Sequence, residues 1–195
     1  DALQMWRDDP AITEVVVRSE LPKAFCAGGD LHVTADVTVT FGGWRRAHAL
    51  QPACGEQLLA DATRTHLITL SRLVPHKRLE MAVDAAAAID GAVLDVVGSG
   101  WWEANLRAYA EEHGVSSRVR FRGQVTEDYK HALLARADAL LMPSRKEGWG
   151  LAVMEAAQHG VPAVGYTFGL RDSVINGKTG ILVEREEDFV AATKQ

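Results

Sequence analysis

Short apolar runs that suit buried strands alternate with segments of helical periodicity from His66 onward. The expected strands are 67–70, 92–97, 119–121, 139–142, 162–164 and 179–183. The expected helices are 79–89, 101–113 and 151–159, with one more beginning near Glu127, capped by Thr126, and a last one near Glu187. Because such alternation is typical of a parallel sheet covered on both faces, we expect an α/β fold with a doubly wound parallel sheet. Ligands of such sheets bind at the carboxyl ends of the strands.

The residues before His66 do not continue this pattern, and the sequence leaves the structure of this N-terminal extension open. The β-branched run 13–18 suits a strand, and the alternating run 33–41 suits an edge strand. We divide the chain into residues 1–31, a linker or junction over 32–65, and a domain over 66–195.

Composition excludes several classes of protein. The net charge of −5 argues against nucleic acid as the main partner. No run of 18 apolar residues is present, so we expect no transmembrane segment. Cys26 and Cys54 are isolated, which argues against a disulfide framework or a zinc site and favours a reducing cytoplasm.

The richest stretch for chemistry follows the expected strand 139–142. Pro143 ends that strand, and a helix is expected to begin at Leu151 after a glycine-containing turn. Glu147 then lies in the loop, and Glu155 lies one turn into the helix. Carboxylates placed in this way can accept hydrogen bonds from pairs of ligand hydroxyls.

The turn itself suits an oxygen-rich ligand. The backbone N–H groups of Gly148, Trp149 and Gly150 are expected to point out of the helix N-terminus. Such a terminus binds a phosphate or a sugar hydroxyl oxygen.

This stretch resembles the E-x7-E signature of retaining GT-B glycosyltransferases (glycosyltransferase family 4, group 1), because Glu147 and Glu155 enclose seven residues. The neighbouring residues also fit the family: Pro143 and Ser144 precede the signature, and residues 160–164 follow it. The resemblance implies the Rossmann-like C-terminal half of a GT-B fold. It implies retaining transfer from a UDP- or GDP-sugar to a hydroxyl acceptor. In that family, Glu155 would meet the nucleotide ribose and Glu147 the donor sugar, with further donor contacts from Gly148, Trp149, Gly150 and Leu151.

Three other loops carry family-like residues. Arg72 and Lys77 follow the first strand, and two cations there suit a diphosphate leaving group. The resemblance gives them that role, although Arg78 stands where the family often has glycine. Gly98 would let the backbone pass close to the donor, and Val125 ends a turn that would face the nucleobase.

We expect no cofactor and no metal ion, because the histidines lack metal-ligand spacing and no Asp-x-Asp is present. The helix dipole and the cations could neutralise a diphosphate instead. A nicotinamide site is rejected because Glu103 stands where the fingerprint needs its third glycine. Trp101 and Trp102 are interpreted as packing residues, and Ser144 as a turn residue rather than a nucleophile.

Residues 1–31 resemble another family, the enoyl-CoA hydratases (crotonases), through Pro22–Asp30. There a backbone N–H of the 27–29 turn would form half of an oxyanion hole. The alternative function is therefore a fragment of an acyl-CoA enzyme, and a third is a nucleotide-binding module that regulates a partner. On the favoured interpretation the chain is a fragment that holds the donor half and is inactive alone. Peripheral membrane association would depend on a missing N-terminal domain.

Overall fold

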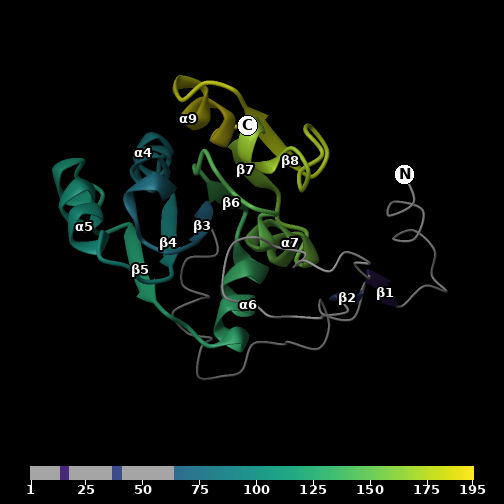
Figure 1. Cartoon of the computed structure of the whole chain (residues 1–195). Helices are drawn as coiled ribbons and strands as arrows, with labels where there is room; N and C mark the ends of the chain where they lie inside the picture. The colour runs from purple at the N-terminus through teal and green to yellow at the C-terminus, as the bar shows by residue number, and fades with distance from the viewer. Residues whose placement is uncertain (1–13, 18–36, 41–63) are drawn as a thin grey trace. The chain divides into compact units, whose positions relative to one another are not determined.

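The computed structural model of the chain describes residues 14–17, 37–40 and 64–195 (Figure 1). The chain divides into two compact units, residues 1–49 and 50–195. In the first unit, β1 (Glu14–Val17) pairs antiparallel with β2 (Val37–Thr40), with Glu14 opposite Thr40. Both expected strands in this region are confirmed. The paired strands come from the two segments that the sequence separates at residue 31.

The second unit is built from alternating strands and helices, as expected. Its strands are β3 (His66–Leu70), β4 (Val93–Val97), β5 (Val119–Gly123), β6 (Ala139–Met142), β7 (Ala163–Tyr166) and β8 (Gly180–Val183). Its helices are η1 (Pro75–Lys77), α4 (Glu80–Ala88), α5 (Glu103–Glu112), α6 (Glu127–Arg136), α7 (Leu151–Gln158), α8 (Thr167–Leu170) and α9 (Glu187–Thr193). All six strands are parallel, in the order β5-β4-β3-β6-β7-β8. The structure confirms the doubly wound α/β fold.

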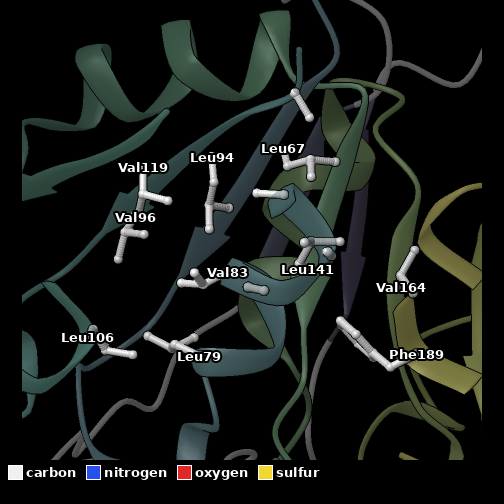
Figure 2. Packing of buried hydrophobic residues seen from close by; sticks show 14 of the residues in the cluster. Leu67, Leu79, Val83, Leu94, Val96, Leu106, Val119, Leu141, Val164 and Phe189 are labelled. Atoms are coloured by element: carbon white, nitrogen blue, oxygen red, sulfur yellow. The ribbon is translucent and has the colours of Figure 1, made fainter. Parts of the chain in front are cut away.

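Helices cover both faces of this sheet, which explains why the strands are apolar on both sides. On one face α4, α5 and α9 pack against strand residues that include Leu67, Leu94 and Leu141 (Figure 2). On the other face α6, α7 and α8 pack against residues that include Ile68 and Leu140. Side chains of alternate residues of β3 therefore pack into the cores on opposite faces of the sheet, and every residue of that strand is buried.

The strand order creates a switch point at the centre of the sheet. After β3 the chain moves outward through β4 and β5, and after β6 it moves the other way through β7 and β8. Because β3 and β6 are neighbours, the loops that leave their carboxyl ends, 71–79 and 143–150, face each other. A crevice at such a point is where doubly wound sheets bind ligands.

A buried charge cluster ties the sheet to α6. Asp95 interrupts the apolar run of β4 and is only 3% exposed. Its carboxylate accepts a hydrogen bond from Arg122 Nε at 2.6 Å, and Arg136 Nη2 lies 3.7 Å away. Buried carboxylates are normally paired or hydrogen-bonded in this way. Arg122 is thereby held against β4.

Sequence and structure differ at a few elements. The short helices η1 and α8 were not expected, because three or four residues carry no periodicity. The packing interpretation is wrong for Trp101, which is 71% exposed. Only Trp102 turns toward α4, where its Nε1 donates to Glu80 Oε1 at 2.5 Å. The predicted cap of α6 is confirmed, since the Thr126 side chain accepts a hydrogen bond from a backbone N–H in the first turn.

Candidate functional site

The loop after β3 holds a short helical turn that ends in a cation. Lys77 is the last residue of η1, and Arg78 closes that turn in the left-handed region with φ 56°. Glycine adopts this conformation without strain, whereas Arg78 carries a side chain in it. Arg72, earlier in the loop, is exposed to solvent.

The loop after β6 is shaped by Ser144 and Gly150. The buried Ser144 Oγ donates to the Lys146 carbonyl at 3.0 Å, so its predicted role as a turn residue is confirmed. Gly150 is the N-cap of α7 with φ 71°, and no side chain caps the helix. Because α7 begins at Leu151, the open N–H groups of its first turn include those of Leu151 and Ala152. These N–H groups directly follow the 148–150 turn, whose own donor role stays a prediction.

The two loops meet through an ion pair across the switch point. Lys77 Nζ donates to Glu147 Oε1 at 2.6 Å, and the side chains are only 15% and 10% exposed. Two of the predicted site residues are thus in direct contact, although 70 positions separate them. The contact places a cation suited to phosphate beside a carboxylate suited to hydroxyls.

Glu155 is paired with a lysine that no sequence motif had pointed to. Lys130 Nζ, on α6, donates to Glu155 Oε1 at 3.0 Å and lies 2.7 Å from Glu127 Oε2. Burial alone would lower the pKa of Lys130, but the hydrogen bonds to these two carboxylates outweigh it and raise that pKa above its ordinary value. The i,i+3 pairing with Glu127 could be seen in the sequence. The contact with Glu155 depends on how α6 packs beside α7.

Gly98 lies where two backbone segments come too close for a side chain. A Cβ at this position would lie 1.9 Å from the Ser71 carbonyl oxygen, and its φ is +123°. Gly100 has the same role, because its Cβ would lie 2.1 Å from the Leu73 oxygen. Hydrogen bonds from Ser71 N to Val97 O and from Leu73 N to Ser99 O fasten these segments together. The two glycines therefore hold the loop of Arg72 in place against the end of β4.

The remaining predicted residues are arranged around these contacts. Gly148 is exposed, Trp149 is 39% exposed and Leu151 is 55% exposed, all at the start of α7. Val125 is half-buried and packs against the core beneath α6 and α7. Within residues 64–195, no hydrogen bond or ion pair joins Arg72 to either glutamate.

Neither a metal centre nor a membrane span is found in the part of the chain that the structure describes. There, no three His, Cys, Asp or Glu side chains are grouped so that they could hold a metal ion. His131 Nδ1 instead contacts His159 Nε2 at 2.8 Å, which links α6 to α7. None of the described helices combines the length and the apolar character needed to cross a bilayer.

Comparison with known proteins gives a family match over most of the chain. The family described as "Glycosyl transferases group 1" matches residues 55–195. A GDP-mannose-dependent alpha-(1-6)-phosphatidylinositol monomannoside mannosyltransferase of Mycobacterium tuberculosis is 38% identical over 141 residues, covering 66% of this chain and 37% of that protein. A glycogen synthase of the same organism is 36% identical over 120 residues, covering 59% of this chain and 29% of that protein.

Solved structures agree on the fold. Sucrose-phosphate synthase from Thermosynechococcus elongatus superposes with a TM-score of 0.66 at 28% identity, covering 71% of this chain and 37% of that one. Anabaena HepE in complex with UDP and glucose gives a TM-score of 0.64 at 23% identity, covering 74% of this chain and 42% of that one.

The family match covers residues 55–195 and does not include the N-terminal segment before residue 55. The chain spans a little over a third of the length of the mycobacterial mannosyltransferase. Neither the family match nor these four proteins support an acyl-CoA enzyme. The crotonase-like turn at 22–30 lies outside the described residues. The division into 1–31, 32–65 and 66–195 stays a prediction.

Proposed function

The chain belongs to the glycosyl transferases group 1 family, and from this premise we propose that it binds a nucleotide sugar as the donor half of a retaining glycosyltransferase. The observation that carries the proposal is the placement of the E-x7-E glutamates. Glu147 lies at the switch point in contact with Lys77, and Glu155 lies nearby on α7 in contact with Lys130. Both carboxylates are thus near loops that can hold a ligand rich in phosphate and hydroxyl groups.

The diphosphate is assigned to the positive side of this site. Lys77 carries a nearly buried ammonium group, Arg72 is exposed in the same loop, and α7 begins with N–H groups that no side chain caps. Together they supply charge and hydrogen bonds to phosphate oxygens without a metal ion. The same groups stabilise the charge that develops on the diphosphate as it leaves.

The hydroxyl groups of the donor are assigned to the carboxylates. Glu147, beside Lys77, would accept hydrogen bonds from the sugar next to the diphosphate. Glu155, on the first turns of α7, would accept from the ribose. The surrounding donor contacts are proposed for Gly148, Trp149, Gly150 and Leu151, with Gly98 and Val125 lining the nucleotide side.

The proposed reaction replaces one bond to the anomeric carbon by another. The bond between that carbon and the diphosphate oxygen breaks, and the electron pair leaves with the nucleoside diphosphate. The acceptor hydroxyl oxygen forms the new bond and gives up its proton to the departing diphosphate, with the anomeric configuration retained. Because the proposed residues all serve the donor, we expect this chain to bind the donor without completing transfer alone.

The nucleotide, the acceptor and the location are also proposals. The mycobacterial relative is named as GDP-mannose-dependent, and HepE was solved with UDP and glucose. We therefore propose GDP or UDP as the nucleotide and a hydroxyl group as the acceptor. We also propose a cytoplasmic location, with peripheral membrane association.

A thermal-shift panel tests this proposal against its alternatives. We expect GDP or UDP and the matching nucleotide sugar to raise the Tm, because a ligand at 100 times its Kd stabilises a fold by about 2.7 kcal/mol. For a chain of this size that is a shift of roughly 5–10 °C. Acetyl-CoA is the control and should leave the Tm unchanged.

Two outcomes of this panel would contradict the proposed function. A shift with acetyl-CoA but with no nucleotide would favour the acyl-CoA alternative. Equal affinity for a nucleotide and for all of its sugar derivatives would favour a plain nucleotide-binding module.

A further inference from the structure

We propose that Lys130 is a positioning residue for the nucleotide: it fixes the carboxylate of Glu155 so that one oxygen stays turned to the ligand. This inference rests on the proposed function, because it assumes that Glu155 binds the ribose. Lys130 lies on α6, outside every motif that the sequence offered. It reaches the site only through Glu155.

The contacts show how Lys130 would act. Its Nζ donates to Oε1 of Glu155 at 3.0 Å, which leaves Oε2 to accept from a ligand hydroxyl. The lysine side chain is 14% exposed, whereas that of Glu155 is 34% exposed. A well-enclosed cation therefore holds a carboxylate that is more exposed than the cation itself. Partial burial makes such a charge-assisted bond stronger than the same contact on an open surface.

The position of the pair within the fold favours a fixed carboxylate. Glu155 lies on α7 one turn before His159, which contacts His131 at 2.8 Å. Lys130 and His131 are adjacent on α6, so two polar contacts join one turn of α6 to the last turn of α7 and its C-cap residue. A carboxylate held from one side in this way loses less side-chain freedom when it binds a ligand.

Lys130 has a second partner, Glu127, outside the proposed site. Glu127 lies 2.7 Å from Lys130 Nζ, but its side chain is 77% exposed. An ion pair with so exposed a group contributes little. The enclosed lysine is directed between this surface carboxylate and Glu155, and only Glu155 belongs to the proposed site.

The test is a double-mutant cycle on nucleotide affinity. Calorimetry first measures GDP and UDP binding to the wild-type chain. The nucleotide that binds more tightly is then titrated into Lys130→Met, Glu155→Gln and the double variant. We expect Lys130→Met to weaken binding about fivefold, or about 1 kcal/mol. In the Glu155→Gln background the same change should cost less than about twofold, because the carboxylate that Lys130 positions is absent.

Two further variants separate positioning from simple stabilisation. Lys130→Arg keeps a cation at this place and should retain affinity within about twofold. Lys178→Met makes the same chemical change at an exposed residue just before the edge strand β8, outside the proposed site, and should leave affinity unchanged. Circular dichroism reports folding for each variant.

The outcomes divide cleanly. If Lys130→Met binds the nucleotide as well as the wild type or more tightly, or loses as much affinity in the Glu155→Gln background, the assignment of Lys130 is wrong while the proposed function stands. A folded wild-type chain that binds neither nucleotide overturns the proposed function and this assignment with it.

Discussion

Replacing Glu155 with alanine should weaken the bare nucleotide and the nucleotide sugar alike, by about tenfold or more. The reason is that a carboxylate accepting from ligand hydroxyls makes a charge-assisted bond worth about 1.5–3 kcal/mol. If Glu155 binds the ribose, that bond is present in both ligands. Calorimetric titration of the variant with each ligand measures the two losses.

Glu147→Ala is the matched variant, and its pattern should differ. It should weaken only the nucleotide sugar, because the sugar is the group assigned to Glu147. The structure sharpens this expectation. Glu147 holds Lys77 at 2.6 Å, so its removal leaves that ammonium to the phosphates, and the bare nucleotide should bind equally well or somewhat more tightly.

Folding must be checked for the Glu147 variants, because Lys77 is only 15% exposed and loses its partner in Glu147→Ala. Glu147→Gln keeps a hydrogen-bond acceptor beside Lys77 and serves as the milder variant. Circular dichroism shows whether each protein is folded. A Glu147 variant that is folded but loses the bare nucleotide as strongly as Glu155→Ala would refute the division of roles.

The largest stability effect is expected at Gly98. A Cβ there would lie 1.9 Å from the Ser71 carbonyl oxygen, and neither atom can turn away, because the oxygen belongs to the backbone and the Cβ is fixed directly to it. The φ of +123° adds strain for any other residue. We expect Gly98→Ala to lower the free energy of unfolding by about 3 kcal/mol or more. Urea unfolding followed by circular dichroism measures this loss.

Gly114→Ala is the control for the backbone conformation alone. Its φ is +67°, but a Cβ there would meet nothing within 4 Å. It should therefore cost only about 1–2 kcal/mol, the penalty of the left-handed conformation. Equal losses at the two glycines would mean that the close approach to Ser71 has no energetic weight.

The fold could be predicted because its signals are local. Apolar runs such as Ala139–Met142 and the alternation after His66 indicate strands and helices without knowledge of their partners. The strand boundaries shifted by a residue or two, and α8 was missed because four residues carry no helical period. The wrong packing role of Trp101 has a similar cause, since the direction of a side chain in a turn depends on its tertiary neighbours.

The candidate site was only partly predictable for the same reason. The sequence places Lys77 and Glu147 in loops at the carboxyl ends of strands, but their contact requires β3 to lie beside β6. Lys130 belongs to no motif and reaches Glu155 only because α6 packs beside α7. At Gly98 the resemblance implies a close approach of the backbone to the donor, and this stays a prediction. The structure adds a close approach of Gly98 to the chain's own loop at Ser71.

The central claim is that this chain binds the nucleotide of a sugar donor with its own cations and helix terminus, without a metal ion. The most direct test is calorimetric titration of the wild-type chain with GDP, UDP and their sugars, in EDTA and then with added Mg²⁺. The account predicts saturable binding of one nucleotide and its sugar, with the same affinity in both buffers within about twofold. Loss of binding in EDTA, restored by Mg²⁺, would contradict it.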